Sequence, residues 1–120
     1  MTRILAVDDS KAIRQMVAAT LQADGYDVTT ADDGSQGLEI AEQESFDLVI
    51  SDVNMPIVGG YEFVRSLRSN DAYRHTPVLM LTTEFEDHHK KTGREAGASG
   101  WIIKPIDPDK LIKAVRRVTS

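Results

Sequence analysis

Acidic side chains and one lysine follow the short apolar runs of this 120-residue chain. Asp8 and Asp9 come directly after the first run, Asp52 after the third and Lys104 after the fifth. If the runs are parallel strands, their carboxyl ends meet at one edge, where three carboxylates and one ammonium would gather. Carboxylates a few Å apart repel each other unless one of them has a raised pKa or a cation is bound. The pattern therefore predicts a divalent metal and an anion that is handled beside it.

Short β-branched runs alternate with longer segments of helical period along the whole chain. The runs are 4–7, 28–30, 48–51, 78–81 and 101–103. The expected helices are a first one that ends before Gly25, then 35–43, 60–69, 87–96 and one that opens with Pro108.

Two of the runs, 48–50 and 78–81, are apolar throughout, as expected of strands that helices cover on both faces. The predicted fold is therefore α/β, a three-layer, doubly wound (βα)5 sandwich. Right-handed crossovers favour the flavodoxin-like strand order 2-1-3-4-5. The switch point of this order lies between the first and third strands, which end in Asp8, Asp9 and Asp52.

Composition excludes several classes of protein. The 41% hydrophobic content is enough for one ordinary core, so we expect a single domain over 1–120. There is no cysteine, and no apolar run approaches the length of a signal peptide core or a membrane span, which leads us to expect a cytoplasmic protein without a membrane partner. The net charge of −5 argues against nucleic acid as the main partner.

The chemistry-bearing residues together resemble the receiver domain of two-component response regulators. The resemblance rests on Asp8-Asp9, Asp52-Val53-Asn54-Met55-Pro56, Gly59-Gly60, Thr82 and Lys104-Pro105. It covers the whole chain with the expected spacing and is similar to the stand-alone type that serves in chemotaxis. It also implies that the Lys104-Pro105 bond is cis.

The resemblance implies a phosphoryl acceptor and a magnesium site. An aspartate can take a phosphoryl group as an acyl phosphate, and Asp52 occupies the acceptor position. Mg²⁺ prefers octahedral oxygen ligands and keeps several waters. By resemblance, one Mg²⁺ ion is bound directly by Asp9 and Asp52 and by the main-chain carbonyl of Asn54, whereas Asp8 acts through water.

The resemblance also assigns the groups around the acceptor. Lys104 is implied to pair with Asp52 at rest and with a phosphoryl oxygen afterwards, while the Thr82 hydroxyl donates to another oxygen. Trp101 occupies the position of a switch aromatic, and it is expected to turn inward as Thr82 moves toward the phosphoryl group. If it does not turn, Trp101 is a core tryptophan.

The function implied is a signalling switch that catalyses only its own phosphorylation and dephosphorylation. A histidine kinase phosphorylates Asp52, the surface of the fourth helix, fifth strand and fifth helix changes, and a target binds. The Asn54 and Glu84 pair at the lifetime-tuning positions is similar to that of the motor-controlling chemotaxis regulator. The implied partners are the chemotaxis kinase, the flagellar motor switch protein and a phosphatase, and the protein is expected to be a monomer.

Other interpretations remain open. Asp9 or Ser10 could be an ordinary helix cap, although independent caps and turns would not bring three acids and a base to one edge. A stand-alone receiver could also serve another phosphorelay, as a shuttle or a phosphate sink. A magnesium-dependent aspartyl phosphohydrolase would use similar chemistry, but such enzymes carry a second aspartate where this chain has Asn54. A flavodoxin-type cofactor carrier is disfavoured because Asp8 and Asp9 would repel its phosphate.

Overall fold

The computed structural model describes residues 1–83 and 94–119 of the chain. Five parallel strands form one sheet in the order β2-β1-β3-β4-β5, which confirms the predicted α/β fold and strand order. The strands are β1 (Arg3–Val7), β2 (Asp27–Ala31), β3 (Leu48–Asp52), β4 (Val78–Thr82) and β5 (Gly100–Ile103).

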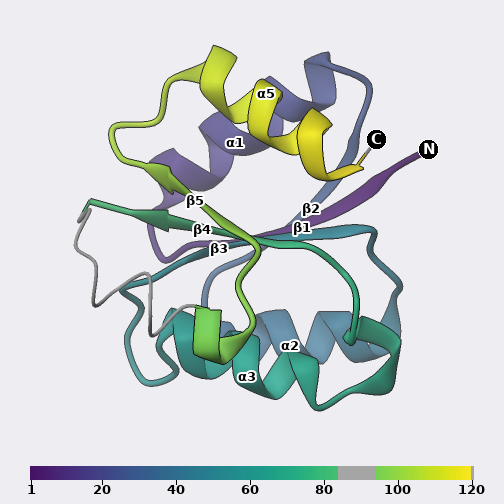
Figure 1. The fold of residues 1–120 in the computed structure, drawn as a ribbon. Helices are drawn as coiled ribbons and strands as arrows, with labels where there is room; N and C mark the ends of the chain where they lie inside the picture. The colour runs from purple at the N-terminus through teal and green to yellow at the C-terminus, as the bar shows by residue number, and fades with distance from the viewer. Residues whose placement is uncertain (84–93, 120) are drawn as a thin grey trace.

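Helices cover both faces of this sheet (Figure 1). Their bounds are α1 (Lys11–Ala23), α2 (Gly34–Gln43), α3 (Gly60–Arg68) and α5 (Pro108–Thr119), with a short 3₁₀ helix, η1 (Asp71–Tyr73). Figure 1 shows α1 and α5 on one face and α2 and α3 on the other. Of the helix expected over 87–96, only residues 94–96 are described, and they are helical. No helix in the described ranges is both long and apolar enough to cross a membrane.

The ends of α1 explain why the chain turns where it does. The Ser10 side chain accepts a hydrogen bond from the Ile13 amide at 3.3 Å and so caps the helix. After the helix, Gly25 adopts a φ of +94°, a conformation that costs glycine little. Because Ser10 is the cap, the carboxylate of Asp9 is not needed for that role.

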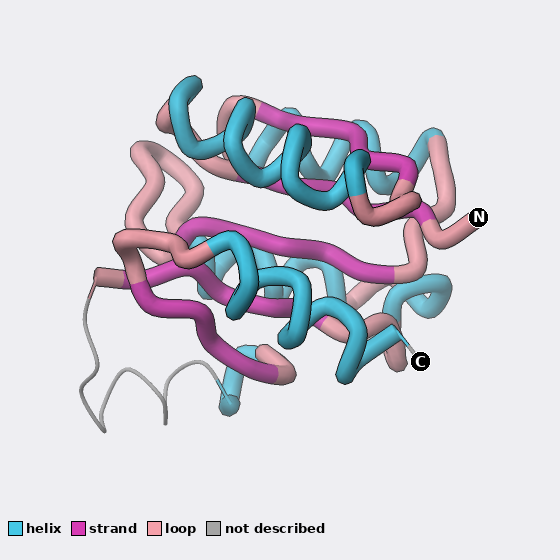
Figure 2. Tube along the Cα trace, turned by 90° about the horizontal axis from the view of Figure 1, so that it is seen from above, coloured by secondary structure: helices cyan, strands magenta, loops and turns pink. Residues whose placement is uncertain are grey.

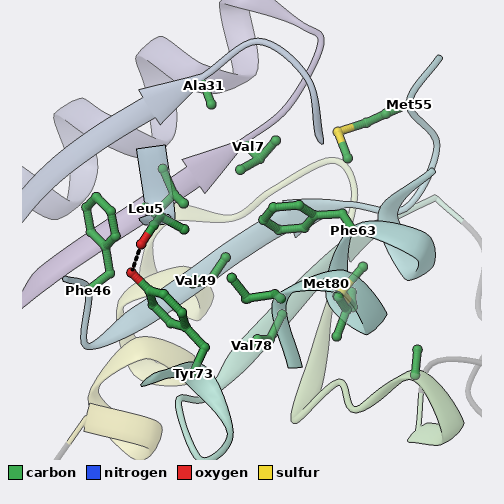
Figure 3. Close-up of a cluster of buried hydrophobic side chains, with 14 of the residues drawn as sticks. Leu5, Val7, Ala31, Phe46, Val49, Met55, Phe63, Tyr73, Val78 and Met80 are labelled. Atoms are coloured by element: carbon green, nitrogen blue, oxygen red, sulfur yellow. Dashed lines mark hydrogen bonds between the residues drawn. The ribbon is translucent and has the colours of Figure 1, made fainter. Parts of the chain in front are cut away.

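Two apolar clusters fix the sheet between its helix layers. On the α2 and α3 face, Phe63 is fully buried against Val7 and its neighbours from the sheet (Figure 3). In the same cluster, the Tyr73 hydroxyl donates a hydrogen bond to the Ala41 carbonyl at 2.8 Å. On the opposite face, Leu111 is among the residues that join α5 to the second cluster.

The view from above shows the two chain ends on one side of the molecule (Figure 2). The first strand starts at that side, so the amino ends of the parallel strands lie there and their carboxyl ends lie on the other side. The loops that follow β1, β3 and β5 therefore share the edge that carries the predicted site.

One residue of these loops has a strained backbone. Ile57 has a φ of +69°, and the Val58 amide donates to the Pro56 carbonyl at 2.8 Å. This is a three-residue γ-turn of the positive-φ form, which is rare. A β-branched residue in this region is a genuine outlier, and the Ile57 side chain is 99% exposed, so burial does not compensate for the strain.

We expect the Ile57→Asn variant to be more stable than the wild-type protein. Asparagine tolerates positive φ better than isoleucine does, and the exposed side chain gives up no buried contact. The free energy of unfolding should rise by about 1 kcal/mol, and the thermal midpoint by about 4 °C. Urea and thermal unfolding measure both quantities. Ile57→Val keeps the β-branched strain and should match the wild type; a gain of equal size in Ile57→Val would show that strain is not the cause.

Candidate functional site

Three carboxylates meet where β1 and β3 end. Each of Asp8, Asp9 and Asp52 offers an oxygen, and these oxygens lie within 4.8 Å of one another. Asp8 and Asp52 are buried, with 2% and 3% of their surface exposed, whereas Asp9 is exposed to solvent. The two strands are direct neighbours in the sheet, which explains why residues 44 positions apart share one pocket.

Lys104 reaches this pocket from the end of β5. Its Nζ lies 3.1 Å from Asp52 Oδ1 and 3.4 Å from Asp8 Oδ2. The Lys104 amide also donates to the Thr82 carbonyl at 2.8 Å, which fixes the chain just after the strand. The Lys104-Pro105 bond is cis, as the resemblance implied. The predicted contact between the lysine and the acidic cluster is thus present.

Hydrogen bonds hold both the carboxylate of Asp52 and the backbone that follows it. The Asn54 amide lies 3.4 Å from Asp52 Oδ1 as a long hydrogen bond, and the Gly60 amide donates to the Val53 carbonyl at 2.9 Å. A Cβ at Gly60 would lie 2.1 Å from the Asp52 carbonyl oxygen. The first turn of α3 can therefore pack on the Asp52 backbone only because residue 60 is glycine.

The buried carboxylate of Asp8 has one oxygen directed into the cluster. Its Oδ1 accepts a hydrogen bond from the Ser10 amide at 2.8 Å. Its Oδ2 has no hydrogen-bond partner among the described residues, and the 3.4 Å approach of Lys104 is a long ion pair. Three carboxylates against one ammonium leave an excess of two negative charges when all are ionised. A hard divalent cation with oxygen ligands fits this donor set.

The charges in the pocket shift two pKa values. Burial, and next the charge of Asp8, raise the pKa of Asp52; the Lys104 ammonium and the Asn54 amide oppose this rise. Burial acts to lower the pKa of Lys104, but the contacts with Asp52 and Asp8 outweigh it and raise that pKa. Lys104 is therefore charged at neutral pH, and the charge on Asp52 is held at an energetic cost.

The predicted switch residues lie beside this cluster along the sheet. Thr82 ends β4 and is buried, and Trp101 lies in β5. The indole is half-buried, packs on the α2 and α3 side of the core, and donates from Nε1 to the Tyr61 hydroxyl at 3.4 Å. Glu84, predicted to tune the phosphoryl lifetime, lies outside the described residues.

One contact of the site was not predicted from the sequence. Arg14, in the second turn of α1, donates from Nη1 to the Asp8 carbonyl at 2.6 Å. Its Nη2 also lies 3.4 Å from the carboxylate of Asp32, which follows β2. The only signal available was a basic residue on the first helix, six positions after Asp8, and such residues are common on exposed helix faces.

Comparisons with known proteins agree with this arrangement. The family model for the response regulator receiver domain matches residues 4–116. The protein PilH of Pseudomonas aeruginosa is 34% identical, and the match covers all of this chain and 99% of PilH. The response regulator ArlR of Staphylococcus saprophyticus is 33% identical over 97% of this chain, which spans only 51% of ArlR.

Solved structures give the same result. Chemotaxis protein CheY4 of Vibrio cholerae is 51% identical with a TM-score of 0.97, over 98% of both chains. A response regulator protein of Burkholderia multivorans is 46% identical with a TM-score of 0.83, and the match covers all of this chain and 96% of that one. With the fold, the acidic cluster and the family match in agreement, this chain belongs to the response regulator receiver family and is a receiver domain of a two-component system.

Proposed function

We propose that this chain is a phosphorylation-activated switch that accepts one phosphoryl group on Asp52 from a histidine kinase. The observation that carries the proposal is the buried Asp52 carboxylate, which lies 3.1 Å from Lys104 and shares a pocket with Asp8 and Asp9. An oxygen nucleophile, a cation and further acidic ligands are the groups that phosphoryl transfer to a carboxylate needs.

The acidic cluster supports a single Mg²⁺ site in the proposed mechanism. Asp9 and Asp52 would hold the ion directly with the main-chain carbonyl of Asn54, and Asp8 would act through water. When bound, the ion neutralises negative charge on the carboxylates and on the incoming phosphoryl group. The Oδ2 atom of Asp8, which has no hydrogen-bond partner among the described residues, supports a role for Asp8 as an acceptor for such a water.

The residues of the chain then have separate tasks. An Asp52 carboxylate oxygen attacks phosphorus as the bond from phosphorus to the donor nitrogen breaks, and the imidazole of the donor keeps that electron pair. The Lys104 ammonium moves from Asp52 to a phosphoryl oxygen, and the Thr82 hydroxyl donates to another. Attack by water on phosphorus later restores the free carboxylate and releases phosphate. The protein resets itself and acts on no separate substrate.

The proposed output is a change in the surface that includes Trp101 and α5. Movement of Thr82 toward the phosphoryl group would leave space behind it, and the indole would turn inward from its contact with Tyr61. A target that prefers this form gains affinity in proportion to the shift in population.

We expect activation to change the fluorescence of Trp101, the single tryptophan of the chain. Beryllofluoride with Mg²⁺ mimics the phosphoryl group, and inward rotation should shift emission to shorter wavelength because the indole leaves solvent. An emission spectrum that stays the same while beryllofluoride binds would remove Trp101 from the mechanism. The Asp52→Asn variant supplies the control, since it should not respond.

Chemotaxis is the output that we propose for this switch. The similarity to the chemotaxis protein CheY4 over the full chain supports it, as does the Asn54 and Glu84 pair, which favours a short-lived signal. The proposed partners in the cytoplasm are a chemotaxis kinase, the flagellar motor switch protein and a phosphatase. A stand-alone receiver of another phosphorelay, as shuttle or phosphate sink, is the second candidate.

Incubation with acetyl phosphate and Mg²⁺ tests the switch itself. Intact mass should show one phosphoryl group per chain, lost in base and not formed with EDTA. A magnesium-dependent phosphohydrolase would instead turn over many equivalents, and a chain that takes up no phosphoryl group would refute the proposal. A pull-down from the source cell with beryllofluoride then separates the outputs. Motor switch protein supports chemotaxis, whereas a histidine phosphotransfer protein alone supports another relay.

A further inference from the structure

We infer that Arg14 is a positioning residue for the metal-binding carboxylates Asp8 and Asp9. The inference rests on the proposed Mg²⁺ site and goes beyond it, because Arg14 touches neither the ion nor the phosphoryl group. It acts through the backbone that joins the two aspartates.

The polar groups of Asp8 are almost all fixed by the protein. Its amide donates to the Ala31 carbonyl at 3.2 Å, and its Oδ1 accepts from the Ser10 amide. Its carbonyl accepts the charge-assisted hydrogen bond from Arg14 at 2.6 Å. Of the polar groups of Asp8, only Oδ2 has no hydrogen-bond partner among the described residues, and it is the oxygen that faces Lys104.

Asp9 depends on the same backbone contact. In the described part of the chain, its exposed carboxylate has no hydrogen bond that could orient it. The carbonyl of Asp8 and the amide of Asp9 belong to one planar peptide unit. The hydrogen bond from Arg14 therefore restrains the orientation of this unit, and with it the position of the Asp9 Cα. Arg14 therefore helps to pre-orient a ligand whose own carboxylate has no hydrogen bond among the described residues.

Asp32 also contacts the guanidinium. Its carboxylate lies 3.4 Å from Nη2, and the Arg14 side chain is only 16% exposed. The planar fork of arginine serves the Asp8 carbonyl and Asp32 at once, which the single ammonium of lysine cannot reproduce as rigidly. Arg14 of α1 thus links the Asp8 carbonyl, which follows β1, to the Asp32 carboxylate, which follows β2, beside the proposed metal pocket.

The charge of Arg14 and its proposed positioning role predict opposite effects on Mg²⁺ affinity when Arg14 is replaced, which makes the inference testable. A positive charge near three carboxylates competes with Mg²⁺, so its removal alone should tighten Mg²⁺ binding. Loss of a residue that orients ligands should weaken binding, typically by 10-fold or more. We therefore expect Arg14→Met to raise the Mg²⁺ dissociation constant by about 10-fold and Arg14→Lys to raise it by about 3-fold.

Lys11→Met is the matched control. Lys11 lines the same shallow groove on α1 as Arg14 and carries the same charge, but it has no hydrogen bond to Asp8 among the described contacts. Its removal should leave the dissociation constant unchanged or lower. Val115→Ala, in the buried face of α5, controls for stability, because it should lower the thermal midpoint without altering Mg²⁺ affinity.

Calorimetric titration with Mg²⁺ alone, with no phosphodonor, measures these constants. Weaker binding in Arg14→Met, with normal binding in Lys11→Met and Val115→Ala, supports the inference. Unchanged or tighter binding in Arg14→Met overturns it; if that variant does not fold, unchanged binding in Arg14→Lys does so. A wild-type chain that binds no Mg²⁺ would instead refute the proposed metal site, which separates the two failures.

Discussion

The Asp52→Asn variant is expected to take up no phosphoryl group and yet to be more stable than the wild type without metal. Phosphoryl uptake is lost because an amide is not a nucleophile that can form the acyl phosphate. Stability rises because the change removes a buried charge that burial and Asp8 both disfavour. Lys104 keeps Asp8 as its partner at 3.4 Å. The free energy of unfolding at neutral pH should therefore rise, by an amount that corresponds to the upward shift of the Asp52 pKa on folding.

The stability difference should depend on pH with a definite sign. A group whose pKa is higher in the folded state than in the unfolded state favours the folded state at pH values below its unfolded pKa. This contribution to stability is lost as the pH rises through the folded pKa. Because the pKa of Asp52 is raised, the advantage of Asp52→Asn should be small in acid and grow as pH rises through that folded pKa. Urea unfolding in EDTA at several pH values measures it.

Mg²⁺ should reverse the order of the two proteins. The wild type gains stability from a ligand that binds only the folded state, and Asp52→Asn loses one ligand and most of that gain. Asp71→Asn, a change of the same type at an exposed residue of η1, should alter neither stability nor Mg²⁺ response appreciably. An Asp52→Asn variant less stable than wild type in EDTA would contradict the account of pocket repulsion.

Gly60→Ala should damage both fold and site. The added Cβ would lie 2.1 Å from the Asp52 carbonyl oxygen and 2.7 Å from the Val53 Cα, and neither backbone atom can rotate away. The start of α3 must then move off β3, at a cost of about 3 kcal/mol. Displacement of Asp52 by even ~1 Å should slow phosphorylation by acetyl phosphate about 100-fold.

The neighbouring glycine provides the control for this change. A Cβ at Gly59 would meet no atom within 4 Å, and its φ of −66° suits any residue. Gly59→Ala should therefore be as stable as the wild type or slightly more so, with normal phosphorylation. Equal stability of the two alanine variants would show that the close approach of α3 to Asp52 does not constrain the site.

The fold could be predicted because apolar periodicity and strand order carry most of the information. Runs such as 48–50 are apolar throughout, and the structure buries them between two helix layers. The strand bounds moved by at most one residue at each end, because backbone hydrogen bonds extend past the apolar run. The third strand, for example, continues through Asp52 itself. Of the expected fourth helix, residues 94–96 are helical, and residues 87–93 lie outside the described residues.

The meeting of the acidic residues and Lys104 could also be predicted, because parallel strands bring their ends to one edge. The contact of Arg14 with the Asp8 carbonyl could not, since the direction of a long side chain depends on the packed structure. The same holds for Arg68, whose guanidinium donates to the carbonyls of Tyr73 and Gly97. The positive φ of Ile57 contradicts the local preference of isoleucine, so no sequence rule would place it there.

The most direct test of the central claim locates the phosphoryl group. The wild-type chain is incubated with acetyl phosphate and Mg²⁺, the acyl phosphate is reduced with borohydride, and the peptides are sequenced by mass spectrometry. The account predicts that the reduced residue is Asp52 and that EDTA prevents its formation. Modification at Asp8, Asp9 or any other residue, or equal modification without a divalent metal, would contradict it.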